Sequence, residues 1–121
     1  MDVLVVDDEP LVREIVAESL YDDGLRVTEA TSAEQALEIA GDRGAPDVLV
    51  TDVNLGQGMD GLQLAEEVRR RWPSAGVVIM TGNPAYVGDR GFEDSERFLT
   101  KPFGPASMVS AVRDLMRRSL R

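Results

Sequence analysis

The chain has 121 residues, of which 43% are hydrophobic and 29% charged, which suits one globular domain with a real core. Its net charge of −9 disfavours nonspecific nucleic-acid binding, and the absence of cysteine and histidine excludes disulfides, thiolate or imidazole metal sites and catalytic triads. No apolar run approaches the ~20 residues that span a bilayer and Met1 begins no signal peptide, so we expect a cytoplasmic protein without membrane contact.

Short apolar runs alternate with amphipathic stretches along the whole chain. The apolar, β-branched runs predict strands at residues 3–6, 26–30, 47–52, 76–81 and 97–100. The stretches between them predict helices at 10–22, from 32 to about 41, at 62–71 and at 105–120, while glycines leave room for only a short helix within 85–96. Such alternation predicts an α/β fold, a doubly wound five-stranded parallel sheet with helices on both faces, in a single domain over 1–121.

Local signals define two of the helices more closely. Pro10 suits the first turn of the first helix, and Asp23-Gly24 ends it. Ser32 and Gln35 have the spacing of a capping box at the start of the second helix. The residues of the first helix that keep apolar helical spacing are Leu11, Val12, Ile15, Val16 and Leu20. Two arginine groups, Arg69 to Arg71 and Arg113 to Arg121, are interpreted as solvated helix faces.

Polar side chains stand where the predicted strands end. Asp7 and Asp8 follow the first strand, Asp52 ends the third, Thr81 ends the fourth and Lys101 follows the fifth. Because parallel strands end at one edge of a sheet, these side chains are expected to share a crevice. Three carboxylates there repel one another unless a hard cation such as Mg²⁺ compensates, and an aspartate so neutralised can act as a nucleophile toward a phosphoryl group.

This constellation, Asp7-Asp8, Asp52, Thr81-Gly82 and Lys101-Pro102-Phe103, resembles the receiver domain of two-component response regulators, over essentially the whole chain. The resemblance implies a flavodoxin-like (βα)5 fold with strand order 2-1-3-4-5. It implies a signalling switch and not an enzyme: the only reactions expected are self-catalysed phosphoryl transfer and autodephosphorylation.

The resemblance also implies roles for single residues. Asp52 is the expected phosphoacceptor, and a histidine kinase or histidine phosphotransfer protein is the expected donor. Asp8, with Asp7 assisting, Asp52 and the backbone carbonyl of Asn54 would hold Mg²⁺. Lys101 and Thr81 would contact the phosphoryl group, and Thr81 and Phe98 would act as the switch. Gly82 and Pro102 would set the conformation of their loops, with a cis or strained peptide bond before Pro102. The phosphoryl donor would dock at Pro10, Leu11, Val12 and Phe103.

The chain departs from the family pattern in two places. The loop between Asp52 and Gly61 is one residue longer and richer in glycine than in many receivers, which bears on metal affinity and phosphoryl lifetime. The segment between Thr81 and Lys101 is short, which bears on the usual output and dimerisation face. We therefore expect a monomer or a weak, phosphorylation-dependent dimer that binds an unknown effector protein.

Several alternatives stay open. We expect no output domain after the last predicted helix, which leaves a stand-alone receiver, a phosphate sink or relay, and a receiver fragment of a hybrid histidine kinase as open alternatives. A phosphohydrolase of the haloacid-dehalogenase type would need an acid where Asn54 stands. A never-phosphorylated scaffold is a further possibility. Taken singly, Thr81 would satisfy backbone groups and Phe98 would belong to the core.

Overall fold

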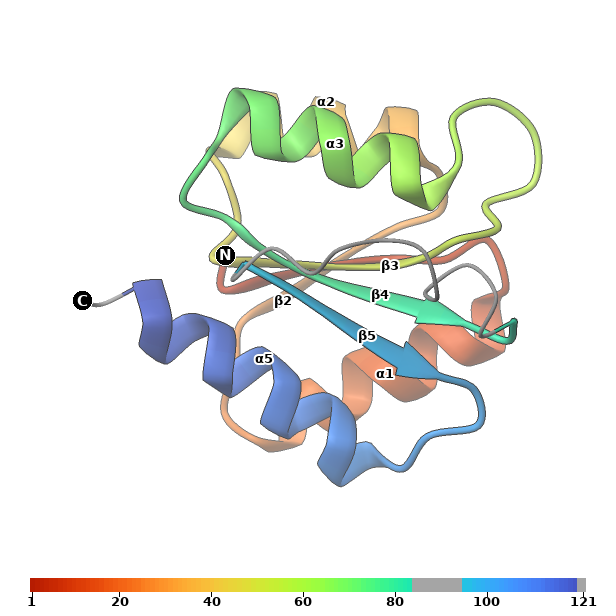
Figure 1. The fold of residues 1–121 in the computed structure, drawn as a ribbon, viewed down its shortest axis with the longest axis vertical. Coiled ribbons are helices and arrows are strands. Elements are labelled where there is room, and N and C mark those ends of the chain that lie inside the picture. The colour runs from red at the N-terminus through yellow and green to blue at the C-terminus, as the bar shows by residue number, and fades with distance from the viewer. Residues whose placement is uncertain (84–94, 120–121) are drawn as a thin grey trace.

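Five parallel strands form one sheet in the order β2-β1-β3-β4-β5, as the computed structural model shows for the described residues, 1–83 and 95–119 (Figure 1). This confirms the predicted fold class and strand order. The prediction for 85–96 lies mostly outside the described residues. The elements are β1 (Val3–Val6), α1 (Pro10–Asp22), β2 (Val27–Ala30), α2 (Ala33–Arg43), β3 (Val48–Asp52), α3 (Gly61–Arg71), β4 (Gly76–Thr81), β5 (Glu96–Thr100) and α5 (Pro105–Ser119).

Helices cover both faces of the sheet. In Figure 1, α2 and α3 lie above the strands and α1 and α5 lie below them. The central strands β1, β3 and β4 are buried along their whole length, which explains why their sequences carry apolar runs instead of alternating, up to the polar residues that end β3 and β4.

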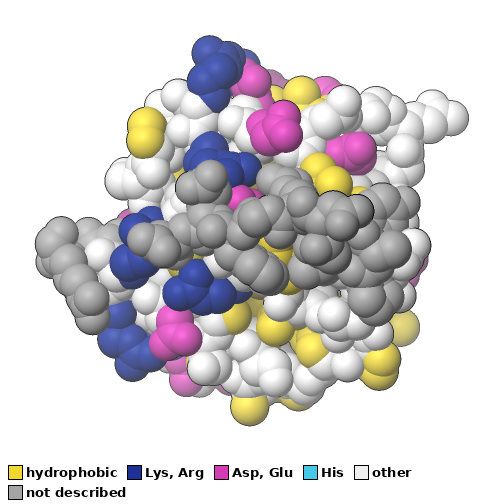
Figure 2. Space-filling view, in the orientation of Figure 1, with side chains coloured by type: hydrophobic (Ala, Val, Ile, Leu, Met, Phe, Trp, Pro, Cys, Tyr) yellow, Lys and Arg dark blue, Asp and Glu magenta, His cyan; other side chains and the backbone are white. Residues whose placement is uncertain are grey.

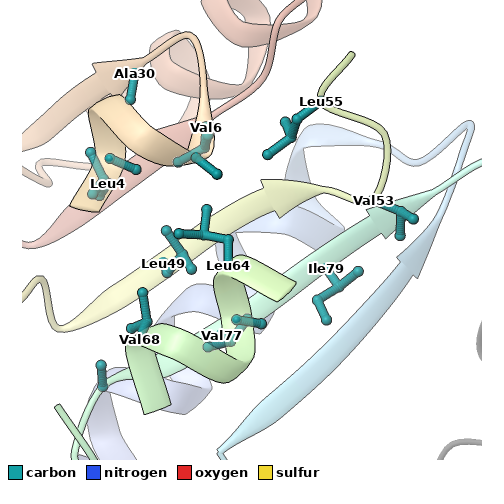
Figure 3. Close-up of a cluster of buried hydrophobic side chains, with 14 residues drawn as sticks. Leu4, Val6, Ala30, Leu49, Val53, Leu55, Leu64, Val68, Val77 and Ile79 are labelled. Atoms are coloured by element: carbon teal, nitrogen blue, oxygen red, sulfur yellow. The ribbon is translucent and has the colours of Figure 1, made fainter. Parts of the chain in front are cut away.

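Two apolar clusters hold these layers together, one on each face of the sheet. Figure 3 shows the cluster under α2 and α3, in which Leu64 and Val68 of α3 face Leu49 of β3 and Val77 of β4. The cluster on the other face joins the sheet to α1 and α5. Its buried members are Val3, Val5, Val16, Leu20, Leu25, Val48, Val50, Val78, Met80, Met108, Ala111, Val112 and Leu115.

The apolar face of α1 is narrower than its sequence predicts. Val16, Ala17 and Leu20 are buried, but Leu11 is 69% exposed and Ile15 is 53% exposed. Leu11 and Ile15 are four residues apart, so they share a side of the helix. That side turns away from the sheet, which leaves two large apolar side chains facing water next to the carboxyl edge.

Helix capping differs from the prediction at α2. Ser32 Oγ accepts a hydrogen bond from the Gln35 backbone N–H at 3.1 Å, as expected, but Gln35 Oε1 accepts from Thr31 N (2.7 Å) and not from Ser32 N. The full reciprocal capping box occurs instead at α3, between Asp60 and Gln63.

Acidic side chains accompany the arginine groups. Arg70 and Arg71 pair with Glu67 on α3, and Arg117 pairs with Asp114 on α5. Figure 2 likewise shows acidic side chains among the basic ones on the side of the molecule turned toward the viewer. This agrees with the interpretation of Arg70, Arg71 and Arg117 as charged helix surface. Arg69 departs from it, because Arg69 is partly buried and pairs at 2.8 Å with Glu96 of β5, which is itself buried. Among residues 1–83 and 95–119, no helix has the length and apolarity needed to cross a membrane.

Candidate functional site

The strand register brings the expected side chains to one edge of the sheet. Val6 of β1 lies beside Thr51 of β3, one residue before Asp7 and Asp52 respectively. Thr81 of β4 lies beside Thr100 of β5, one residue before Lys101. In Figure 1 the arrowheads of β4 and β5 point toward this edge.

Asp52 and Lys101 form an ion pair at the centre of the edge. Lys101 Nζ lies 2.8 Å from Asp52 Oδ2, and the Asp52 side chain is only 8% exposed. The Asn54 backbone N–H donates to Asp52 Oδ1 at 3.3 Å. Burial lowers the pKa of Lys101, but the hydrogen bond and charge of Asp52 outweigh it, so the net effect raises that pKa and keeps the ammonium charged.

Asp7 is the most deeply buried acid of the site. Its side chain is inaccessible to solvent, Oδ1 accepts from Glu9 N at 2.9 Å, and Oδ2 has no hydrogen-bond partner. Burial raises the pKa of Asp7 from 3.8 to about 6; the charges of Asp52 and Asp8 act in the same direction, against the Glu9 hydrogen bond and Lys101. A buried carboxylate oxygen without a donor is costly, so this atom calls for a cation or a proton.

Asp8 is exposed and lies against the loop that follows β3. Gly56 has φ +77°, and a Cβ on it would stand 3.1 Å from Asp8 Oδ2. A glycine at this position therefore lets the loop backbone approach the carboxylate.

The acidic side chains at this edge fit a Mg²⁺ ion that keeps most of its waters, and not a metal site built from three or more converging carboxylates. Within residues 1–83 and 95–119, no three carboxylates converge closely enough to make a ready-made metal site. Mg²⁺ commonly takes only one or two carboxylates and keeps several waters, and the unpartnered Oδ2 of Asp7 near Asp52 and Asp8 fits such a site.

Thr81 and Gly82 lie at the end of β4, at the same sheet edge as Asp7, Asp8, Asp52 and Lys101, a set of residues referred to as the pocket. Thr81 is buried, and its Oγ1 accepts from Asn83 N at 3.0 Å and lies 3.1 Å from Asn83 O. The hydroxyl therefore serves the local turn in this structure, as the alternative interpretation anticipated. Gly82 faces open space within the described part of the chain, because a Cβ there would meet no atom within 4 Å.

Lys101 and Thr81 are also connected through the backbone, because Lys101 N donates to Thr81 O at 2.7 Å. The Lys101–Pro102 peptide bond is cis, as expected. Phe98 is half-buried and packs against the α2–α3 side of the core, so this structure shows it partly in a core role.

An apolar groove of about 330 Å³ lies beside the pocket, between α1 and the segment after β5. Of the four residues expected to dock the donor, Val12 and Phe103 line this groove. Pro10 and Leu11 do not line it and are exposed nearby. The complete lining is Val12, Ile15, Val16, Lys101, Pro102 and Phe103. Apolar helical spacing alone does not show that Ile15 lies at the surface, so the sequence does not predict its place in this groove.

Two further residues near the site were not anticipated. Arg13 Nη1 donates to the Asp7 backbone carbonyl at 3.0 Å, while its Nε contacts Glu29 Oε1 at 3.1 Å. Glu34 Oε2 accepts from Met59 N in the loop after β3. Both contacts join a side chain to distant backbone, and no local sequence pattern signals such contacts.

Comparison with known proteins identifies a family. A model of the response regulator receiver domain matches residues 3–113. The transcriptional regulatory protein FixJ of Azorhizobium caulinodans is 38% identical over 124 residues, covering 98% of this chain. The chain spans 56% of that protein's length and about half of the length of two other transcriptional regulatory proteins that it matches.

Solved structures agree with this assignment. A response regulator receiver protein from Sinorhizobium medicae superposes with a TM-score of 0.88 at 30% identity, covering 97% of this chain and 94% of that chain. The receiver domain of the hybrid histidine kinase CckA gives a TM-score of 0.79 at 32% identity, covering 94% of this chain and 97% of that chain.

Proposed function

Because this chain belongs to the family of response regulator receiver domains, which serve two-component signalling, we propose that Asp52 accepts a phosphoryl group from a phosphohistidine on a histidine kinase or phosphotransfer protein. One observation carries the proposal: the 2.8 Å ion pair of Lys101 with Asp52, beside the buried, unpartnered oxygen of Asp7.

The geometry supports a simple transfer step. A carboxylate oxygen of Asp52 attacks phosphorus, the phosphorus–nitrogen bond of the donor breaks, and its electron pair returns to the imidazole. Lys101 then shifts its hydrogen bond from the carboxylate to a phosphoryl oxygen, which keeps the new anion paired. Asp8 and Asp52, with the Asn54 backbone carbonyl and with Asp7 assisting, would hold the Mg²⁺ that neutralises the incoming phosphoryl charge.

Phosphorylation also gives a physical basis for switching. Once Lys101 pairs with the phosphoryl group, the Thr81 hydroxyl can exchange its hydrogen bonds with the Asn83 backbone for a stronger one to a charged phosphoryl oxygen. Thr81 pairs with Thr100 of β5, two residues after half-buried Phe98, so movement of Thr81 would open room toward that ring. The partner-binding state is thus favoured by the tighter contacts that the phosphoryl group makes in it.

The direct test is intact mass spectrometry of the protein after incubation with a small phosphoryl donor, with and without Mg²⁺. We expect a gain of about 80 Da, one phosphoryl group, only when Mg²⁺ is present. An unchanged mass under both conditions, with transfer also absent from a phosphohistidine protein, would contradict the proposal.

We further propose that the donor docks on the apolar groove and on exposed Leu11. Leu11→Ala should lower kcat/KM for a cognate phosphohistidine donor about tenfold relative to transfer from a small donor, because buried apolar contact is lost. Tyr21→Ala is the matched control, since Tyr21 is a 66% exposed apolar residue farther along α1. Equal effects of the two substitutions would rule out docking at this end of the helix.

The second candidate function is a relay, in which Asp52 passes its phosphoryl group on to another histidine. The similarity to the receiver domain of a hybrid histidine kinase favours it. Transfer of label from the phosphorylated chain to a histidine phosphotransfer protein, faster than hydrolysis, would distinguish a relay from a switch with its own effector.

A further inference from the structure

The loop between β3 and α3 carries Asn54 at the phosphoacceptor end and is restrained from the other side by Glu34. Glu34 belongs to the first turn of α2, far from Asp52 in sequence and outside the pocket. Its Oε2 nevertheless accepts a hydrogen bond from the Met59 backbone N–H at 3.1 Å. A carboxylate acceptor makes this bond stronger than a neutral one.

The backbone at Gly58 shows how closely the carboxylate approaches the loop. Gly58 has φ +87°, and a Cβ there would lie 3.0 Å from Glu34 Oε2 and 3.3 Å from Oε1. A Cβ at this position would be strained by the positive φ and would require the Glu34 carboxylate to give way by a few tenths of an ångström. The absence of a side chain at Gly58 therefore leaves room for the Glu34 carboxylate to reach Met59 N.

The same loop contacts two acids of the pocket before it reaches Glu34. Asn54 N bonds Asp52 Oδ1 at 3.3 Å, Leu55 is buried, and Gly56 lies against Asp8 Oδ2. A shift of the loop at residues 58 and 59 would therefore move backbone that adjoins both Asp52 and Asp8.

The platform that carries Glu34 is itself well fixed. Ser32 Oγ caps the first turn of α2, and Gln35 Oε1 accepts hydrogen bonds from both Thr31 N and Thr31 Oγ1. Side-chain hydrogen bonds to the free N–H groups of a first turn stabilise it. The hydrogen bond from Met59 N is also the main reason why the pKa of Glu34 is lowered, which keeps this carboxylate ionised.

We propose that Glu34 is a positioning residue: by holding Met59 N it fixes the glycine-rich loop, and so sets where Asn54 and Gly56 lie relative to Asp52 and Asp8. This role presupposes the phosphoacceptor function proposed above. It gives the glycine-rich loop a restraint that offsets the conformational freedom of Gly56 and Gly58.

The test compares three substitutions on α2. Glu34→Ala removes the acceptor, Glu34→Gln keeps an acceptor oxygen without the charge, and Glu38→Ala removes an exposed acid one turn later on the same helix. Two readouts apply to each folded protein: the Mg²⁺ dissociation constant by calorimetry, and the hydrogen-exchange rate of the Met59 amide by NMR.

For Glu34→Ala we expect the Met59 amide to exchange faster and the Mg²⁺ dissociation constant to rise about tenfold. Glu34→Gln should restore both values to within about threefold of wild type, because one neutral hydrogen bond remains. Glu38→Ala should change neither. If Glu34→Gln and Glu38→Ala weaken Mg²⁺ binding as much as Glu34→Ala does, charge alone is responsible and the positioning role is wrong.

Failure of this role can be told apart from failure of the proposed function. A wild-type protein that binds Mg²⁺ and is phosphorylated, with Glu34→Ala unchanged in both readouts, overturns the role of Glu34 alone. A wild-type protein that neither binds Mg²⁺ nor gains a phosphoryl group overturns the function of the pocket and the role of Glu34 with it.

Discussion

Asp52→Asn is expected to abolish phosphoryl uptake, so that no gain of about 80 Da appears after incubation with a small donor and Mg²⁺. The amide lacks the anionic oxygen that attacks phosphorus, and it removes the negative partner of Lys101. The substitution keeps the shape of the side chain, and the amide oxygen can still accept from Asn54 N, so the fold should be retained.

Asp47→Asn is the matched control for this experiment. Asp47 is an exposed acid directly before β3, at the opposite end of the strand from Asp52. It should be phosphorylated like the wild type. Phosphoryl uptake by Asp52→Asn, located by peptide mapping to Asp7 or Asp8, would show that another carboxylate is the acceptor.

Asp7→Asn is expected to raise the free energy of unfolding by about 2 kcal/mol near pH 7.5 without Mg²⁺. The wild-type carboxylate is fully buried, has one unpartnered oxygen, and has a pKa of about 6 against 3.8 when unperturbed. Asn is neutral and keeps an oxygen for the hydrogen bond from Glu9 N.

The pH dependence follows from the direction of this shift. Between pH 3.8 and about 6 the Asp7 carboxyl is largely protonated in the folded protein but largely ionised in the unfolded chain. The stability contributed by the protonated carboxyl is therefore lost as pH rises through this range, and the advantage of Asp7→Asn should grow with it. Urea unfolding at about pH 5 and about pH 7.5 should show the smaller difference at the lower pH.

Magnesium should reverse the order of stability. Saturating Mg²⁺ should stabilise the wild-type protein, since binding only to the folded state raises its stability, and should stabilise Asp7→Asn much less. If Asp7→Asn is instead less stable than the wild type without Mg²⁺ at both pH values, the Asp7 carboxylate stabilises the fold through its hydrogen bond. It is then not a buried charge that destabilises the fold until a cation binds.

Most of the fold could be predicted from the sequence because the central strands are buried on both faces. Runs such as 48–50 and 77–80 are continuously apolar, and turn formers mark the ends of their strands. The position of each strand then places its terminal polar residue at the shared edge, and the ion pair between Asp52 and Lys101 follows from that placement.

The details that could not be predicted depend on how helices turn against the sheet. Apolar spacing on α1 is satisfied equally well by a wide or a narrow buried face, so it could not show that Leu11 and Ile15 are exposed. The contacts of Arg13 with the Asp7 carbonyl and of Glu34 with Met59 N join segments whose distance apart is fixed only in the folded chain.

The strand order also has a kinetic consequence. Every strand pairs in parallel with a partner reached by a crossover connection, so no pair can form as a local hairpin. Each pairing first requires a long connection to lose conformational entropy before the contacts between the strands can stabilise it. Such topologies therefore fold slowly compared with helical bundles. Asp7, Asp52 and Lys101 follow or end β1, β3 and β5, so their pocket assembles only when β1, β3, β4 and β5 have all paired. A chain that lacks one of these pairings has no pocket to phosphorylate.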